Sequence, residues 1–289
     1  MNLIEIVVLV LKISLLLTAL AYGLKGSPAD FLYVLRKPGQ LLRSILAMNI
    51  LMPAVAISMA VFLDLPKLVN VTLIALSVSP LAPIFPKKPL EAGGREAYVT
   101  GLMVAAGILS VILIPLTLEI IARAFHKPVA VDTKPIVVTI LITVIIPMVV
   151  GFAIRHFAPN FTEKIINPLT IFSRVLLIAA VLPILFKTFP VFLQLLGDGT
   201  ILAIVAFVVI GMLIGHLLGG PEKADRTVLA LATASRHPAI AMTLANANLP
   251  DHKLVPATLL LYLLINAILA LPYLKLIKKS KPEHTEPAS

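Results

Sequence analysis

Cysteine and tryptophan are both absent from this chain of 289 residues, and charged residues make up only 13% of it. Without cysteine there is no disulfide, no thiolate metal ligand and no cysteine nucleophile. Soluble domains are about one-quarter charged, whereas this chain is 59% hydrophobic. The composition therefore excludes an ordinary soluble globule and predicts an all-α polytopic membrane protein.

Catalytic motifs are also lacking. The sequence contains no His-Glu-x-x-His pair, no glycine-rich phosphate loop and no paired carboxylates within an apolar run. We therefore expect neither an enzyme nor a cofactor, and an integral membrane enzyme stays as a rival that ligand turnover in detergent would revive. Gly93 and Gly94 are expected to form a turn that ends one helix and starts another.

Nine apolar runs are long enough to cross a bilayer, which takes about 20 helical residues. Six of them contain no Asp, Glu, Lys or Arg, and these are 44–63, 68–86, 97–118, 135–154, 199–221 and 254–274. Three more are interrupted by one or two basic residues, and these are 6–24, 165–196 and 227–249. The chain is predicted to form a single transmembrane domain over 1–277, followed by a disordered polar tail over 278–289.

The net charge of +10, from 24 basic and 14 acidic residues, is explained by membrane topology. Basic residues collect on the cytoplasmic side of membrane proteins. With nine spans, sixteen of the 24 basic residues fall on the side of the tail and six on the other side. The amino terminus is predicted outside the cell membrane and the carboxyl terminus in the cytoplasm. The partner that the charge implies is the lipid bilayer and not a nucleic acid.

Spans three and eight are not expected to be continuous helices. Span three contains prolines at positions 80, 83, 86 and 89, and a proline inside a helix costs about 3 kcal/mol or more. In span eight, Pro238 disfavours helical backbone at His237. Non-helical backbone at membrane depth must be enclosed by protein or line a cavity. Both interruptions should therefore face the interior.

The two interrupted spans have a faint common pattern at an offset of 156 residues. The matched pairs are Leu73 with Leu229, Ser77 with Thr233, and Ser79 with Ser235. Spans three and eight cross the membrane in opposite directions, so the pattern indicates inverted repeats over about 1–127 and 134–277. Paired helix interruptions at corresponding positions are typical of a transporter binding site.

Arg236 is the strongest candidate for a functional residue. A charge near the membrane centre costs about 2.5–3.5 kcal/mol on insertion scales, and no acid of its own span is close to it in sequence. Three roles are open: it binds an anionic substrate, it stands where a coupling cation would, or it is held by carbonyls of the interrupted span three. His237 could carry a proton near neutral pH or bond to freed carbonyls.

Hydroxyl and amide side chains near the interruptions complete the predicted site. The hydroxyls can line a polar site or bond back to their own helix, and the amides can bind substrate or join helices. The predicted substrate-binding residues are Arg236, His237, Ser235, Thr233, Ser77, Ser79, Asn266 and Asn49. No metal site is predicted. Lys87 and Lys88 either draw anions toward this site or serve the topology alone.

Several stretches of the chain together resemble the bile acid:sodium symporter family, also called the sodium bile acid cotransporter-like family. They are YGLKGSPADFLYVLRKPGQLLRS, NILMP, the SP and EAGG of span three, LALATASRHPAIAMTLA, and Asn266 of the last span. The resemblance covers nearly the whole chain. It implies two inverted repeats, a panel domain and a core domain with two broken helices that cross, and alternating access. It also implies the shorter, nine-span form of the family.

The resemblance places the family's sodium ligands on side chains of the wrong chemistry. Those positions are Ala232, Arg236 and His237 in span eight, Phe85 and Pro86 in span three, Val99 and Met103 in span four, and Met48 in span two. None of these side chains can coordinate sodium, so a sodium ion could bind only through other oxygens. A guanidinium in the site would repel it. The family's substrate-side asparagine is retained as Asn266.

These observations predict a carrier that moves a small organic anion across the membrane by alternating access. In this hypothesis Arg236 replaces the coupling cation, so that transport is sodium-independent or linked to protons. Two alternatives remain open. One is a non-transporting membrane binding or sensor protein of the same fold, and the other is a sodium-coupled symporter that binds the ion through backbone oxygens.

Overall fold

The computed structural model describes residues 3–125, 133–195, 199–249 and 254–279, and every regular element in these ranges is a helix. The elements, in chain order, are α1 (Leu3–Lys25), α2 (Pro28–Phe31), α3 (Pro38–Ile45), η1 (Leu46–Leu51), α4 (Met52–Phe62), α5 (Lys67–Val78), α6 (Lys87–Glu91), α7 (Glu96–Phe125), α8 (Thr133–Ile140), η2 (Leu141–Ile145), α9 (Ile146–Phe157), α10 (Pro159–Gln194), α11 (Thr200–Leu218), α12 (Lys223–Ala234), α13 (Pro238–Asn248) and α14 (Val255–Lys279). Residues 280–289, which hold most of the predicted tail, lie outside the described residues.

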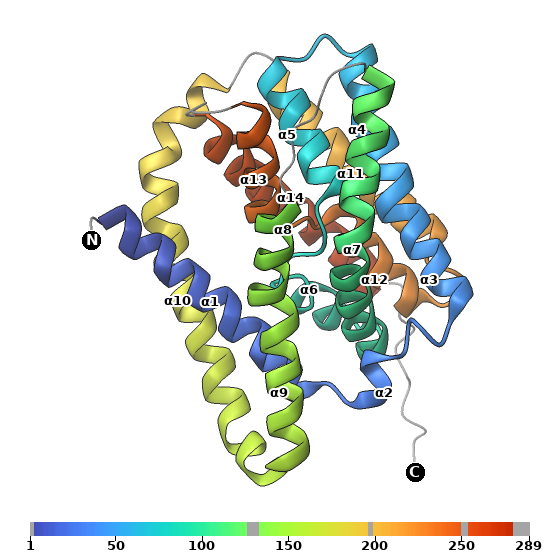
Figure 1. The fold of residues 1–289 in the computed structure, drawn as a ribbon, viewed down its shortest axis with the longest axis vertical. Helices are drawn as coiled ribbons and strands as arrows, with labels where there is room; N and C mark the ends of the chain where they lie inside the picture. The colour runs from blue at the N-terminus through green and yellow to red at the C-terminus, as the bar shows by residue number, and fades with distance from the viewer. Residues whose placement is uncertain (1–2, 126–132, 196–198, 250–253, 280–289) are drawn as a thin grey trace.

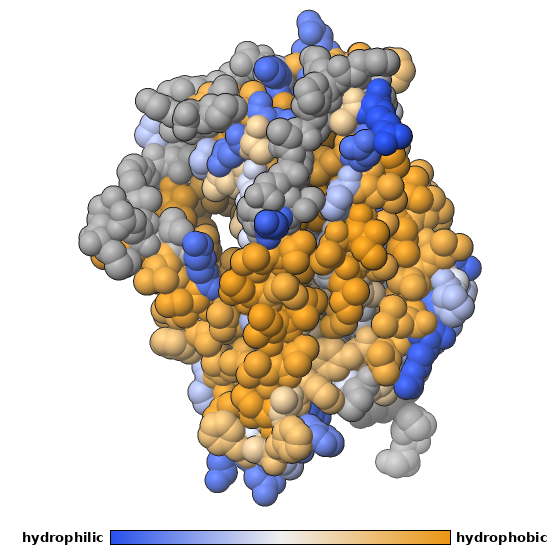
Figure 2. Space-filling view, viewed as in Figure 1, coloured by the Kyte–Doolittle hydropathy of each residue, from blue (hydrophilic) through white to orange (hydrophobic). Residues whose placement is uncertain are grey.

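Six stretches of helix in the described part are long and apolar enough to cross a membrane. They are Pro38–Phe62, Glu96–Arg123, Ile136–Phe157, Pro159–Phe186, Thr200–Leu218 and Val255–Ile277. Figure 2 shows apolar residues covering the middle of one face of the molecule, with hydrophilic residues toward its two ends and along its side edges. The prediction of an all-α polytopic membrane protein is confirmed at this level. The other three predicted spans correspond to α1, to α5 with the segment after it, and to α12 with α13, and the count of nine stays a prediction.

Helix α1 packs along α9 and α10 (Figure 1). The approach of α1 to α9 depends on two glycines, because a Cβ at Gly23 would meet the backbone of Met148 and one at Gly151 would meet Leu20 O. The guanidinium of Arg155 in α9 donates to the carbonyls of Leu24, at 2.9 Å, and Lys25, at 2.7 Å. Carbonyls at the end of a helix have no partner within that helix. Arg155 therefore caps the carboxyl end of α1 and joins it to α9.

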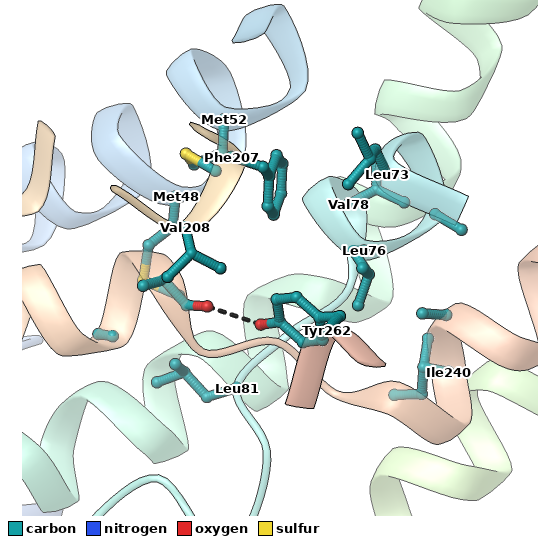
Figure 3. Close-up of a cluster of buried hydrophobic side chains, with 14 of the residues drawn as sticks. Met48, Met52, Leu73, Leu76, Val78, Leu81, Phe207, Val208, Ile240 and Tyr262 are labelled. Carbon is teal, nitrogen blue, oxygen red and sulfur yellow. Dashed lines mark hydrogen bonds between the residues drawn. The ribbon is translucent and has the colours of Figure 1, made fainter. Parts of the chain in front are cut away.

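A second set of helices encloses the main apolar core. Helix α11 packs closely on α12, and α5 packs on α4 and α13. Figure 3 shows the centre of this core, where side chains of η1, α4, α5, α11, α13 and α14 surround Phe207 and Tyr262. Both rings are fully buried, and their centroids are 6.4 Å apart. The core therefore gathers around the ends of α5 and α12.

Helices α5 and α12 both end inside this core, and prolines explain where. Ser79 follows α5 with an extended backbone, and Pro80 follows it. Ser235 and His237 are likewise extended after α12, and Pro238 then opens α13. Proline forces the residue before it away from helical backbone yet fits the first turn of a new helix. Between α6 and α7 the chain turns at Gly93, whose φ is +78°.

Candidate functional site

The two non-helical segments, after α5 and after α12, lie directly against each other. The backbone N–H of His237 donates to Pro80 O at 2.8 Å, and the side chain of Arg236 donates to Ser79 O at 3.2 Å. Residues that are 157 positions apart in the chain are thus in contact. Each segment supplies partners for the backbone groups that the other leaves free, as buried backbone requires.

Arg236 is buried at this contact, with 1% of its surface exposed. Nη1 donates to Ser79 O, and Nη2 donates to Met48 O of η1 at 2.8 Å. Nε has no hydrogen-bond partner, and no carboxylate lies within ion-pair distance of the guanidinium among the described residues. The positive charge is therefore held by carbonyl oxygens alone.

Tyr262 of α14 fixes the end of α12 beside Arg236. Its hydroxyl donates to Ala234 O at 2.6 Å and accepts from the backbone N–H of Arg236 at 2.7 Å (Figure 3 shows the bond to the carbonyl). Sequence reasoning missed this residue. A signal was present, because Tyr262 lies four positions before Asn266 and helical residues at that spacing share a face.

Replacing Tyr262 with phenylalanine should loosen the end of α12. The change keeps the ring but leaves Ala234 O and the N–H of Arg236 buried without their shared partner. An unsatisfied buried polar group costs about 1–3 kcal/mol, so we expect a clear fall in melting temperature in detergent. Tyr273→Phe is the matched control, since Tyr273 lies on the same helix, is only partly buried and bonds to His216. An equal fall in both variants would contradict this role of Tyr262.

His237, which follows Arg236 in the chain, and Asn266 of α14 each have a buried polar atom without a partner among the described residues. His237 Nε2 is 3.5 Å from Thr143 Oγ1 of η2, and Asn266 Nδ2 donates to Ser235 Oγ at 3.4 Å. His237 Nδ1 and Asn266 Oδ1 are buried and have no partner among the described residues. Buried polar groups are nearly always bonded, so these atoms and Arg236 Nε are available to a ligand.

The other predicted side chains lie near the interruptions but bond within their own helices. Their hydroxyls donate to carbonyls three or four residues back, each at 2.7 Å: Ser77 to Ile74, Ser79 to Ala75 and Thr233 to Leu229. Asn49 lies in η1, next to Met48, whose carbonyl accepts from Arg236. Of the predicted set, the structure brings together Arg236, His237, Ser235 and Asn266 by direct or shared contacts, and the backbone of Ser79.

Two basic residues, Lys88 of α6 and Arg95 just before α7, bond to helices around the site. Arg95, just before α7, donates through Nε to Asp225 Oδ1 of α12 at 2.8 Å, and this carboxylate raises the pKa of Arg95. The ammonium of Lys88 donates to the backbone carbonyl of Asn266 at 3.3 Å. Burial, with a smaller effect from Lys87, lowers the pKa of Lys88 to about 8. The sequence indicated neither contact, because each joins residues that are more than a hundred positions apart.

A helical protein with several apolar spans, in which two non-helical segments meet deep in the bundle, belongs to the class of polytopic membrane transporters. The sequence model of the sodium bile acid symporter family matches residues 12–195, more than half of the chain. The chain belongs to this family. It is also similar to a curated protein named "Uncharacterized sodium-dependent transporter YocS" from Bacillus subtilis (strain 168), with 25% identity over 267 residues, which is 90% of this chain and 81% of that protein.

Family membership confirms the resemblance inferred from the sequence and gives the chain a function of the transporter type. The matched stretch runs from α1 to the end of α10 and includes the segment after α5. Arg236, His237 and Asn266 lie beyond it. No group of three or more His, Asp or Glu side chains that could hold a metal ion occurs in the described ranges.

Proposed function

We propose that this protein is a carrier of a small organic anion that works by alternating access, with the guanidinium of Arg236 in the place of a coupling cation. In this proposal nine spans cross the cell membrane with the amino terminus outside, and they form two inverted repeats. The interrupted spans three and eight cross at the substrate site. The observation that carries the proposal is the burial of Arg236 on the carbonyls of Met48 and Ser79, without a carboxylate partner in the described residues.

The charge of the site supports an anionic substrate. A buried cation without a counter-ion loses its hydration and gains little in return. Hydrogen bonds from two carbonyl groups satisfy Nη1 and Nη2 of Arg236, but they do not neutralise the charge. An organic anion would, and Asn266 Oδ1 and His237 Nδ1, which are buried and have no partner among the described residues, would bind its other polar groups.

A sodium ion held by backbone oxygens fits this site poorly. Four carbonyls of the contact already accept hydrogen bonds: Met48 O and Ser79 O from Arg236, Pro80 O from His237, and Ala234 O from Tyr262. A second cation among them would lie close to the guanidinium, and the repulsion of two unit charges at about 4 Å is several kcal/mol at the effective dielectric of a protein. The name of the Bacillus subtilis relative includes sodium dependence, so the two proteins should differ in coupling.

The test is uptake of labelled organic anions into proteoliposomes, with and without an inward sodium gradient and with and without a proton gradient. We expect uptake that does not change when sodium is replaced by choline. Empty liposomes and liposomes with the relative from Bacillus subtilis are the controls. Strict dependence on sodium would overturn the substitution of Arg236 for the ion, and anion binding without any flux would favour a membrane sensor.

A further inference from the structure

A second site is formed by a pocket of about 110 Å³ between α1, α10 and the segment that leads into α6. Three of its lining side chains are cations: Lys25 at the end of α1, Lys87 at the start of α6, and Arg174 in α10. Figure 1 shows α1 and α10 side by side over this part of the chain. None of the eight residues predicted to bind the substrate, Arg236 included, lines this pocket.

The cations of the pocket exceed its nearby acids. Lys87 Nζ is 4.0 Å from Glu91 Oε1, and both side chains are about half exposed. Lys25 lies over the ring of Tyr22, 5.8 Å from its centroid, and among the described residues neither Lys25 nor Arg174 has a carboxylate partner. One carboxylate against three cations leaves a surplus of two positive charges around a partly enclosed space. Like charges gathered in this way repel one another unless an anion lies between them.

The hydrogen-bonding character of the lining also favours an anion. The hydroxyls of Thr18, Thr170 and Ser173 donate to carbonyls of their own helices. The groups that remain to donate into the pocket are therefore Lys25, Lys87, Arg174 and the phenol of Tyr22. A planar guanidinium with lysines beside it is the arrangement that binds phosphate and carboxylate oxygens, since the guanidinium can donate two parallel hydrogen bonds.

We propose that this pocket binds an oxyanion group with two negative charges, of the class that a phosphate monoester has. Lys25 and Lys87 lie on the side that the proposed topology assigns to the cytoplasm, and Arg174 lies within predicted span 165–196, nearer its cytoplasmic end. The inference rests on the proposed function in one respect: it takes the bound oxyanion group to be part of the transported substrate. If the group belongs to the substrate, the carrier prefers divalent organic anions to monovalent ones, and the pocket binds the charged group on the cytoplasmic side.

The test uses the full chain in detergent, with inorganic phosphate as the probe and chloride at equal ionic strength as its reference. We expect phosphate to raise the melting temperature and to bind measurably by calorimetry. Lys25→Gln and Arg174→Gln should each weaken the binding by about tenfold, as the loss of a hydrogen bond to a charged group does, and Arg174→Lys should weaken it less. Lys164→Gln is the matched control, because Lys164 is an exposed cation of the same α10 outside the pocket.

A second arm separates a soluble anion from a lipid headgroup. The same variants are compared in nanodiscs of phosphatidylcholine with and without phosphatidic acid. Phosphate binding in detergent that Lys25→Gln and Arg174→Gln weaken supports the proposal for a soluble ligand. Stabilisation by phosphatidic acid alone, lost in the same variants, supports the oxyanion site and overturns its place in the substrate path.

Equal effects of chloride and phosphate, or equal binding in all variants and the control, overturn the site itself. If uptake fails while the variants lose phosphate binding as expected, only the proposed function falls.

Discussion

Arg236→Met is expected to weaken anion binding by at least tenfold and to abolish uptake while leaving the protein folded. The substitution leaves Met48 O and Ser79 O without their donor, which costs about 1–3 kcal/mol for each group. It also removes a buried and unpaired charge, whose desolvation costs several kcal/mol in the folded protein. The two effects oppose each other at similar magnitude. The melting temperature should therefore change by only a few degrees, whereas anion affinity should fall by at least tenfold.

Two further variants decide what the guanidinium does. Arg236→Lys keeps the charge but cannot reach both carbonyls with a planar group, so partial binding is expected. Arg236→Gln keeps polar donors without the charge, and it should behave as Arg236→Met does in binding. Uptake that survives in Arg236→Met would show that the arginine has only a structural role, which is to join η1 to the segment after α5. A collapse of the fold in Arg236→Met, with rescue in Arg236→Lys, would show the same.

The sequence alone predicted the places where the helices end. Prolines act through local backbone geometry, so Pro80 and Pro238 mark the ends of α5 and α12 without any knowledge of the fold. An arginine in an apolar run with no acidic residue close to it is likewise recognisable from the sequence, and this made Arg236 a candidate. The apolar runs themselves gave the helical class, since length and hydropathy are enough for a membrane helix.

The partners of these residues could not be predicted in the same way. Arg236 binds Met48 through its backbone carbonyl, and every residue has such a group, so no side-chain pattern indicates the contact. Tyr262 and the Arg95–Asp225 pair depend on how α12 lies against α14 and α7, which is a property of packing. The pocket with Lys25, Lys87 and Arg174 is a similar case, because the sequence counts all three among the basic residues of the cytoplasmic side and does not show that they lie around one pocket.

Gly215→Ala should destabilise the protein strongly, because it forces α11 away from α12. A Cβ at Gly215 would meet Leu229 O and lie 2.6 Å from Ala230 Cα, and both are backbone atoms that cannot rotate aside. Overpacking of this kind costs about 1–3 kcal/mol and occasionally more. Since α12 carries Ala234 and leads into Arg236, we expect lower yield, a lower melting temperature and weaker anion binding together.

Two other glycines of the same chain provide graded controls for this prediction. At Gly211, one helical turn earlier, the nearest atoms are the flexible end of Met52, at 3.2 Å, and Ala234 Cα at 3.4 Å, so alanine should be tolerated with a small loss. At Gly39 nothing lies within 4 Å of the added atom, and alanine should be neutral or stabilise α3 by about 0.5–1 kcal/mol. Thermal unfolding in detergent measures the series. The loss of stability should be largest at Gly215, where the neighbour is rigid backbone, smaller at Gly211, where it includes a flexible side chain, and absent at Gly39, where the space is open. An equal loss at all three positions would contradict the idea that close packing of α11 on α12 supports the site.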